Sequence, residues 1–383
     1  MKLRLVILTE IIAPYRIPVF NALSKLSEID LRVIFLSEND PSLRGWLVYK
    51  NEIEFSYQTL PSLRWRIANR NILLNRGLEP TLTALAPQVV ICGGYNYIAS
   101  WQARAWAKSK RTPFLLWIES TAEDQRSNRL MIQFLKNRFV RDCDAFVVPG
   151  SSSSQYLQSF GIPPGRMFTA PNAVDNDRFY QIAAQARMDA ESIRVKLGLP
   201  SRFFLFGGRL VPEKGIFDLL DAYRALSDGV RESVGLVFAG DGAAAHKLRA
   251  EASGVNNVHF LGFQQRDELA CIMGLATALV LPTHSDTWGL VVNEAMACGL
   301  PVIVSQVAGC AADLVRPGWN GFLVKPYDRR ELSTALEKIA QNEKETLRMA
   351  QNSLLHIRNF SPQACAGGIS SAALAFKEAA ACA

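Results

Sequence analysis

The stretch "ALVLPTHSDTWGLVVNEAMACGLPVIVS", residues 278–305, decides the fold of this chain. It starts with the apolar run "ALVLP", crosses the polar loop "THSDTW", enters "GLVVNEAMACG" with helical patterning, and ends in the apolar run "PVIVS". Two short apolar runs around a helix predict a strand, a crossover helix and a parallel strand. The first amides of such a helix lack backbone partners and can bind an anion.

The same alternation of apolar runs and helical patterns extends over the whole chain. We predict strands in the first half at residues 3–9, 31–36, 88–94, 113–119 and 145–150. After Pro171 the pattern restarts, with runs at residues 203–208, 235–240, 258–262, 278–282, 301–305 and 321–324. This predicts an α/β protein with two doubly wound parallel-sheet domains, residues 1–173 and 174–359, joined by a linker near residues 171–180. A last helix follows "FSP" in residues 360–383.

Composition limits the class of protein. At 383 residues two globular domains are the better expectation, and no apolar run approaches the ~18–20 residues that cross a bilayer. The beginning of the chain reads as a strand and loop without a cleavage site, so we expect neither a membrane span nor secretion. Seven cysteines without a CxxC pair indicate buried thiols in a reducing cytoplasm. Four histidines, none before His246, argue against a metal site.

The positive charge lies in the first half. Residues 1–170 hold 21 Lys+Arg and 13 Asp+Glu, a net +8, which leaves 21 against 22, or −1, for the rest of the net +7. Residues 126–142 predict a basic amphipathic helix, which either packs on the sheet with a solvated cationic face or lies on anionic lipid. Without a nucleic-acid-binding module, nucleic acid is not an expected partner. On a helix the apolar residues of this stretch gather near one face and the basic residues near its borders: Leu130, Phe134, Leu135 and Phe139, with Arg129, Lys136 and Arg138.

In "GGRLVPEKG", residues 207–215, two glycines end a strand, and two cations follow around a proline turn. Ligands of doubly wound sheets bind at the carboxyl ends of strands, so Arg209 and Lys214, directly after Gly208, are placed to hold phosphate oxygens. Two solvated loop cations are the alternative. No Walker pattern is present. We interpret the similar "GDG" of residues 240–242 as a turn between a strand and a helix.

Two acids flank the predicted helix start in the opening stretch. Asp286 precedes the helix and Glu294 lies in its second turn, so both can face one crevice and accept hydrogen bonds from vicinal hydroxyls. Gly289 lets a phosphate approach the backbone closely. The residues alone also fit an N-capping aspartate and a surface glutamate.

Several motifs, in this order and spacing, resemble the carboxyl-terminal domain of family 4 glycosyltransferases: "GGRLVPEKG", "FAGDG", "VHFLGF", the opening stretch, "AGCAADLV" and "NGFLV". They cover about residues 200–325 and are highly specific. The first half is similar more loosely, through "APYRIPVFNALS", "CGGYN", "LLWIEST", "DAFVVPGSSSSQYL" and "APNAVD".

The resemblance implies a GT-B architecture of two Rossmann-like domains facing a central cleft, with the last helix crossing back to the first domain. It implies a retaining enzyme that needs no metal and no cofactor besides its nucleotide-diphosphate sugar. By position, Arg209 and Lys214 would hold the diphosphate, Glu294 the ribose hydroxyls and Asp286 the donor sugar. Amides of Gly289 and Leu290 would help bind the phosphate or the sugar, and the nucleobase would lie near Phe260 to Phe263.

The chain departs from the family pattern at two positions. Asp286 stands where the family usually has glutamate, which is one methylene longer. The first domain also lacks the histidine that approaches the donor hexose in many members, and Glu119 is the nearest substitute, as a covalent or electrostatic participant. A capped strand end is the alternative for Glu119. Gly93 and Gly94 end another strand of this domain and leave room for donor or acceptor.

We therefore expect a cytoplasmic or peripheral membrane enzyme at the inner face of the plasma membrane. It would transfer a sugar to a growing, lipid-linked surface glycan of the exopolysaccharide, O-antigen or lipopolysaccharide type. Two alternatives stay open at this point. One is a non-catalytic subunit that binds a nucleotide sugar, and the other is a nucleotide-sugar 2-epimerase.

Overall fold

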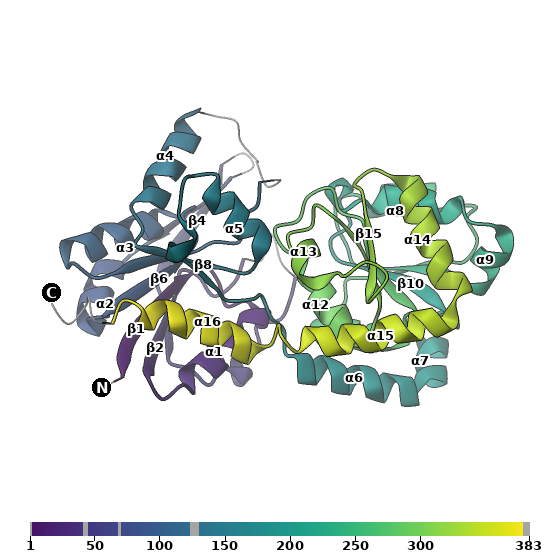
Figure 1. The fold of residues 1–383 in the computed structure, drawn as a ribbon, viewed down its shortest axis with the longest axis horizontal. Helices are drawn as coiled ribbons and strands as arrows, with labels where there is room; N and C mark the ends of the chain where they lie inside the picture. Colours follow the sequence, from purple (N-terminus) through teal and green to yellow (C-terminus); the bar gives the residue numbers. More distant parts are fainter. Residues whose placement is uncertain (1, 41–44, 68–69, 123–129, 378–383) are drawn as a thin grey trace. The chain divides into compact units, whose positions relative to one another are not determined.

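The computed structural model describes residues 2–40, 45–67, 70–122 and 130–377. The chain forms two compact units, shown in Figure 1. The N-terminal unit contains the residues up to Ala173 and those from Pro362 onward, and the C-terminal unit is Val174–Ser361. The chain therefore passes from one unit to the other twice.

Seven parallel strands form the main sheet among the described residues of the N-terminal unit, in the order β3-β2-β1-β6-β7-β8-β9. The strands are β1 (Leu3–Thr9), β2 (Ile29–Phe35), β3 (Tyr57–Thr59), β6 (Val89–Gly93), β7 (Phe114–Trp117), β8 (Ala145–Val148) and β9 (Met167–Thr169). The helices are α1 (Ile17–Ser24), α2 (Leu78–Leu85), α3 (Ile98–Ser109), α4 (Leu130–Arg141), α5 (Ser151–Gln158) and α16 (Pro362–Leu374). Short 3-10 turns lie at Pro14–Arg16, Lys50–Glu52 and Pro164–Arg166.

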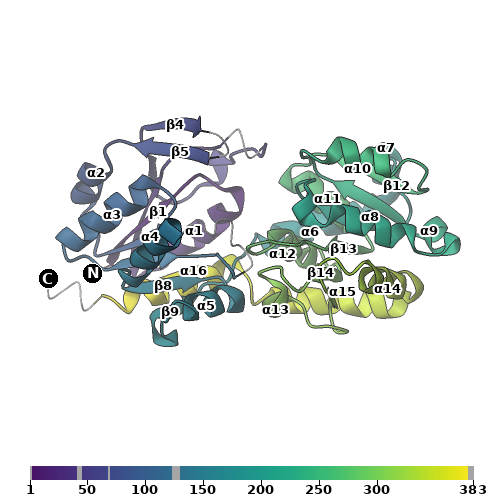
Figure 2. The ribbon, with the colours of Figure 1, turned by 90° about the horizontal axis from the view of Figure 1, so that it is seen from above.

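A hairpin stands apart from this sheet, as Figure 2 shows. Its antiparallel strands are β4 (Ser62–Ile67) and β5 (Arg70–Asn75). The predicted strands did not include this hairpin, because its apolar residues are interrupted by arginines. They also omitted β3 and β9, which are three residues long and too short to carry a readable pattern.

Six parallel strands form the sheet of the C-terminal unit within its described residues, in the order β12-β11-β10-β13-β14-β15. The strands are β10 (Phe203–Gly207), β11 (Gly235–Ala239), β12 (Val258–Gly262), β13 (Ala278–Leu281), β14 (Val302–Ser305) and β15 (Gly321–Val324). The longer helices are α6 (Asn176–Met188), α7 (Ala190–Leu197), α8 (Ile216–Arg224), α11 (Arg266–Leu275), α12 (Leu290–Ala297), α14 (Arg329–Gln341) and α15 (Glu343–Ile357). The short helices are η4 (Pro212–Lys214), α9 (Asp228–Ser233), α10 (Ala245–Glu251) and α13 (Ala311–Leu314).

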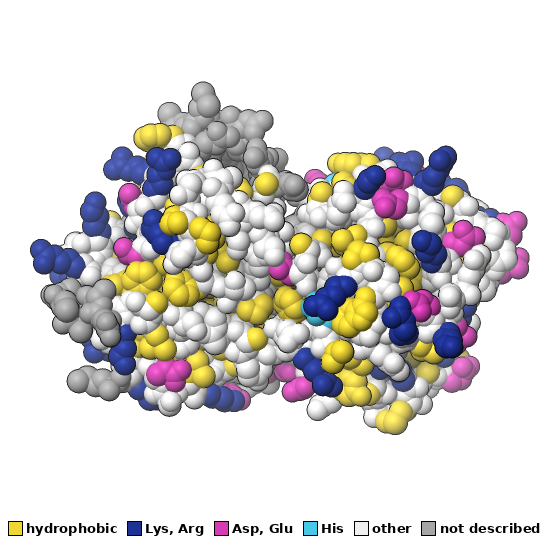
Figure 3. All heavy atoms as spheres, viewed as in Figure 1, with side chains coloured by type: hydrophobic (Ala, Val, Ile, Leu, Met, Phe, Trp, Pro, Cys, Tyr) yellow, Lys and Arg dark blue, Asp and Glu magenta, His cyan; other side chains and the backbone are white. Residues whose placement is uncertain are grey.

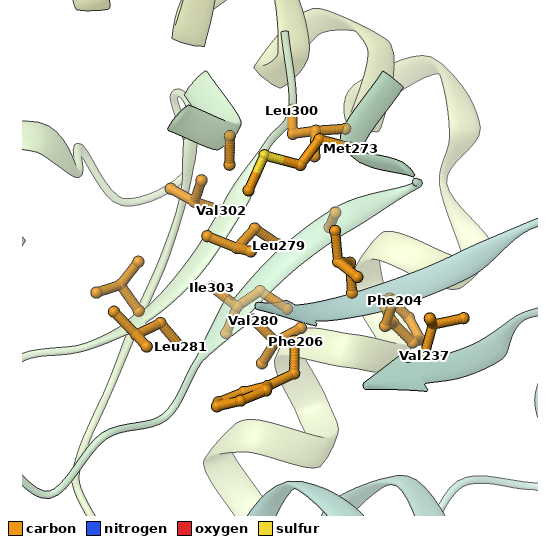
Figure 4. Close-up of a cluster of buried hydrophobic side chains, with 14 of the residues drawn as sticks. Phe204, Phe206, Val237, Met273, Leu279, Val280, Leu281, Leu300, Val302 and Ile303 are labelled. Atoms are coloured by element: carbon orange, nitrogen blue, oxygen red, sulfur yellow. The ribbon is translucent and has the colours of Figure 1, made fainter. Parts of the chain in front are cut away.

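The central strands of both sheets are buried on two faces, which explains why they read as continuous apolar runs. Every residue of β10, β11, β13 and β14 is buried. Figure 4 shows part of this core, in which Phe206, Val280 and Ile303 lie on one face of the sheet and Leu279 and Val302 on the other. The structure thus confirms two doubly wound α/β domains, each with its own core.

The linker expected at residues 171–180 is shorter than predicted. Helix α6 begins at Asn176, because the Asp175 carboxylate accepts a hydrogen bond of 3.1 Å from the amide of Arg178 and caps the helix. An aspartate in a turn-rich stretch indicates a helix start as well as a turn.

Helix α16 completes the core of the N-terminal unit. Cys365, Ala366 and Ile369 are buried among residues of α1 and the central strands, so the last helix covers the same face of the sheet as α1. The contact is close at Gly368, where a Cβ would lie 2.1 Å from the carbonyl oxygen of Thr169. Small residues on α16 therefore allow the helix backbone to lie directly against β9.

This close approach predicts opposite effects at two adjacent glycines of α16. Gly368→Ala should lower the free energy of unfolding by about 1–3 kcal/mol, because backbone must move to admit the methyl group. Gly367→Ala is the matched control, since a Cβ there has nothing within 4 Å. That control should be neutral or stabilising by up to about 1 kcal/mol. Urea unfolding followed by tryptophan fluorescence measures both, and equal effects would contradict the packing.

Candidate functional site

The candidate site of the C-terminal unit lies at the carboxyl edge of its sheet. Strands β10 and β13 are neighbours in the sheet, although they are not consecutive in the chain. The loops that follow these two strands therefore leave the sheet side by side. This is the point where strand order reverses, and doubly wound sheets bind ligands there. The loop after β10 carries Arg209 and Lys214, and the loop after β13 carries Asp286.

The loop that carries Arg209 is held by backbone contacts. The amide of Leu210 donates to the carbonyl oxygen of Asp241 over 2.9 Å, and a Cβ at Gly240 would lie 1.8 Å from the carbonyl oxygen of Gly208. The "GDG" segment therefore connects β11 to α10, a strand to a helix as predicted, and it also packs against the loop that carries Arg209. The Arg209 side chain is exposed and has no ion-pair partner among the described residues. A fixed loop thus presents an unpaired guanidinium.

Lys214 and Asp286, predicted to hold different parts of a ligand, contact each other. The Lys214 ammonium forms an ion pair with the Asp286 carboxylate, and the two side chains are 15% and 16% exposed. Solvent screens such a pair less than a pair on the open surface. The sequence did not indicate this pairing, because 72 residues separate the two side chains.

Backbone hydrogen bonds fix the loop around Asp286. The amide of His284 and the hydroxyl of Thr283 both donate to the carbonyl oxygen of Glu213, over 2.8 and 2.9 Å. Further along, the carbonyl oxygen of Asp286 accepts from the amide of Gly309 over 3.0 Å. The N-cap residue of helix α12 is Gly289, so Asp286 does not cap this helix. The alternative of an N-capping aspartate is therefore wrong.

The start of helix α12 has the geometry of an anion site. Gly289 adopts a φ of +93°, and a Cβ there would also lie 2.9 Å from Leu281. No side chain caps the helix, and the amides of Gly289 and Leu290 have no backbone acceptor in the described part of the chain. Such amides, with the positive end of the helix dipole, favour a negatively charged group.

Glu294, in the second turn of α12, has an unusual environment. Its carboxylate has no hydrogen-bond or ion-pair partner in the described ranges. Burial raises the pKa of this group from 4.5 to about 7, with Arg266 opposing the shift. Near neutral pH the group therefore exists in both protonation states, so it can donate to hydroxyls as well as accept from them.

Phe263 follows β12, at the same edge of the sheet as Arg209. Its side chain is 48% exposed, which is unusual for a phenylalanine next to a buried sheet. The preceding Gly262 has a φ of +72° and turns the chain at the strand end. An exposed ring in this place can stack on a flat ligand group.

Glu119 and Gly94 lie in the N-terminal unit, after β7 and β6. Glu119 forms an ion pair with Arg16, whose guanidinium stacks over the Trp117 ring at 3.8 Å from its centroid. Arg16 was not among the predicted site residues. Its place in the sequence was a signal, because the loops after β1 and β7 leave the same edge of one sheet. Gly94 has a φ of +104°, and a Cβ added to it would have nothing within 4 Å.

The helix predicted at residues 126–142 is α4 (Leu130–Arg141), and residues 123–129, with Arg129, lie outside the described residues. The predicted single apolar face is wrong: Phe139 is fully buried, whereas Phe134 is 63% exposed. Five residues correspond to about 140° of rotation around a helix, so the two rings point to different sides. Lys136 lies over the rings of Tyr95 and Tyr156 and is not a free border cation.

No metal-binding group of three or more His, Cys, Asp or Glu side chains occurs within the part of the chain that the structure describes. The described cysteines are free thiols, buried except for the partly exposed Cys271, and Cys382 lies outside these ranges. None of the described helices has both the length and the apolar character that a membrane span requires.

Two family models match this chain. The model described as "Glycosyltransferase Family 4" matches residues 22–178, and the model described as "Glycosyl transferases group 1" matches residues 189–355. A D-inositol 3-phosphate glycosyltransferase of Stackebrandtia nassauensis is 29% identical over 239 residues, 59% of this chain and 52% of that protein. An uncharacterized glycosyltransferase of Methanocaldococcus jannaschii is 29% identical over 169 residues, 44% of this chain and 46% of that protein. The chain spans about half the length of these two curated relatives.

Solved structures share the fold. HepE of Anabaena, in complex with UDP, has a TM-score of 0.74 and 17% identity, covering 98% of this chain and all of that one. WaaG, a glycosyltransferase involved in lipopolysaccharide biosynthesis, has a TM-score of 0.67 and 17% identity, covering 97% of this chain and 99% of that one. At these identities the likeness concerns the fold, and it confirms the predicted α/β GT-B class.

The raised pKa of Glu294 predicts a pH-dependent cost to stability. Because the folded-state pKa lies above the unfolded value, stability from this group is greatest below pH 4.5 and is lost as pH rises through about 7. Glu294→Gln keeps the shape and removes the charge. From pH 5 to pH 8 the variant should gain about 2–3 kcal/mol in unfolding free energy relative to the wild type. Urea unfolding at both pH values measures this, and a pH-independent difference would disprove the shift.

Proposed function

Because this chain belongs to the family 4 glycosyltransferases, we propose that it transfers a sugar from a nucleotide-diphosphate sugar to an acceptor hydroxyl. The observation that carries the proposal is the Arg209 guanidinium, which has no ion-pair partner among the described residues. It lies on the fixed loop after β10, and the loop after the neighbouring strand β13 leads into α12. The complex of HepE with UDP supports a nucleotide diphosphate as the ligand class.

The proposed chemistry follows from where charge develops. As the bond between sugar and phosphate breaks, negative charge grows on the departing diphosphate. Arg209, Lys214 and the amides of Gly289 and Leu290 are held in place before reaction, so they stabilise this charge without reorganising. Each such group contributes about 2.7–4 kcal/mol, judged by the loss of a typical oxyanion-hole donor. These groups take the part of a metal ion, and we propose a metal-independent enzyme.

The ion pair of Lys214 with Asp286 gives the lysine two proposed roles. Its ammonium would bridge the diphosphate and Asp286, which keeps the carboxylate close to the anion without direct repulsion. The other oxygen of Asp286 would accept a hydrogen bond from a hydroxyl of the donor sugar. Since aspartate is one methylene shorter than the usual glutamate, this contact requires the sugar to lie nearer to the loop.

Glu294 and Phe263 would hold the nucleoside. The carboxyl group of Glu294 can pair with two ribose hydroxyls, because each of its two oxygens can accept a hydrogen bond. The exposed ring of Phe263 would stack on the base. We further propose retention of configuration by attack on the same face of the sugar, with a phosphate oxygen taking the acceptor proton. In this scheme Glu119, oriented by Arg16, is the candidate electrostatic participant from the N-terminal unit.

For the acceptor, we propose a growing lipid-linked surface glycan, reached at the inner face of the membrane. The net +8 of residues 1–170 supports this, as do Phe134 and Leu135, which are 63% and 44% exposed on α4 near the exposed Arg138. On the face shown in Figure 3, Lys and Arg side chains are spread among acidic ones without one dominant basic patch. Membrane contact would therefore depend on exposed apolar side chains together with charge.

Loss of either phosphate-binding cation should impair the reaction. Arg209→Ala and Lys214→Ala should each lower kcat about a hundredfold or more, because they remove a charge stabiliser of the transition state. A panel of nucleotide sugars, screened by thermal shift, identifies the donor for the assay of transfer and donor hydrolysis. Lys344→Ala, at an exposed lysine of α15, is the control and should leave turnover unchanged. Normal turnover in both test variants would reject the assignment.

Membrane contact should depend on the exposed apolar pair of α4. The double variant Phe134→Glu, Leu135→Glu should lose at least tenfold in binding to anionic phosphatidylglycerol vesicles, measured by sedimentation, because it opposes both insertion and charge attraction. The matched control changes the exposed Leu347 and Leu355 of α15 to glutamate. If the α4 variant still sediments like the wild type, α4 does not contact the membrane.

A further inference from the structure

His284 lies two residues before Asp286 and makes contacts that the proposed chemistry does not use. Its ring Nε2 lies 2.6 Å from Oδ2 of Asp218, at hydrogen-bond distance. The ring also stacks on Tyr327, with 3.8 Å between the ring centroids. The side chain is 18% exposed, so these contacts largely replace solvent around it.

Asp218 is a fixed acceptor for this histidine. It lies in the first turn of α8 and is 7% exposed, and its second carboxylate oxygen accepts from Nε of Arg329 over 2.8 Å. Arg329 also pairs with Asp221 over 2.8 Å. With both oxygens engaged and the helix packed in the core, the Asp218 carboxylate has little freedom to follow a moving loop.

The contacts of His284 reach both sides of Lys214. Its backbone amide donates to the carbonyl oxygen of Glu213, directly before Lys214, and its ring contacts Asp218, four residues after Lys214. Between these points a Cβ at Gly215 would lie 2.0 Å from the carbonyl oxygen of Pro282, so the two loops touch backbone to backbone. His284 therefore connects the chain just before Asp286 to the residues on both sides of Lys214.

We propose that His284 is a positioning residue, which acts through Asp218 to hold Asp286 against Lys214. Hydrogen bonds to the backbone hold the loop at Glu213 and, beyond it, at Gly309. The ring contact adds a side-chain anchor at His284, which limits rotation of the residues between these two points. The expected effect of His284 on turnover rests on the proposed function, in which Lys214 and Asp286 act on the donor. The structural link from His284 to Asp286 does not depend on that function.

A double-mutant cycle tests the link. His284→Ala should lower kcat at least tenfold, and in the Asp286→Ala background it should change kcat less than twofold, because the residue it positions is gone. A histidine that only stabilised the fold would reduce kcat by the same factor in both backgrounds. His284→Gln places an amide donor where Nε2 lies and should restore kcat to within threefold of the wild type.

The control is His356→Ala. His356 is 7% exposed and its Nε2 lies 2.9 Å from the carbonyl oxygen of Asp313, a comparable bond on another helix of the same unit. It should change kcat less than twofold, with or without Asp286. Equal losses for His284→Ala in the two backgrounds, or unchanged turnover in the single variant, would overturn the inference.

Unfolding equilibria of the same proteins separate this inference from the proposed function. His284→Ala should raise the equilibrium constant for unfolding by some factor. That factor should be at least threefold smaller in the Asp286→Ala background than in the wild type. If the wild type neither transfers nor hydrolyses any donor in the panel, the proposed function fails, and the unfolding cycle alone decides the link. Equal factors in the two backgrounds would refute it.

Discussion

The ion pair between Lys214 and Asp286 joins the loop after β10 to the loop after β13, and the arrangement of the candidate site depends on it. Both side chains are mostly withdrawn from solvent, at 15% and 16% exposure, so neither charge is easily left alone. Removing one partner of such a pair costs more than the pair itself contributes, because the remaining charge stays poorly solvated. The pair therefore constrains geometry more than it adds stability.

Close backbone packing is what lets these loops converge. A Cβ at Gly215, Gly240 or Gly309 would lie 2.0, 1.8 or 1.9 Å from a carbonyl oxygen of a neighbouring loop. Only a residue without a side chain fits there, so the glycines bring the backbone of separate loops into contact at one edge of the sheet. The charges at this edge differ: Arg209 has no ion-pair partner among the described residues, Lys214 is neutralised by Asp286, and burial raises the pKa of Glu294 to about 7.

Much of the fold could be predicted from the sequence, because the deciding signals are local. The opening stretch showed a strand, a loop, a helix and a strand, and the structure has β13, α12 and β14 there with Gly289 at the helix start. Buried parallel strands must be apolar on both faces, so continuous runs marked them along the chain. Where the local signal was short or interrupted, at β3, β9 and the hairpin of β4 and β5, the prediction failed. The rotation of α4 was misjudged because apolar spacing alone does not state which side is covered.

By itself, the sequence determined the fold class, the resemblance to a family and the residue types at the strand ends, since each depends on patterns within a few residues. Only the tertiary structure decided which of these side chains meet. Lys214 contacts Asp286, Arg16 contacts Glu119, and His284 contacts Asp218 across 66–103 residues of chain. The physical reason is that such pairs form where the sheet brings separate loops to one edge. Burial, which raises the pKa of Glu294, is likewise set by neighbours that lie elsewhere in the chain.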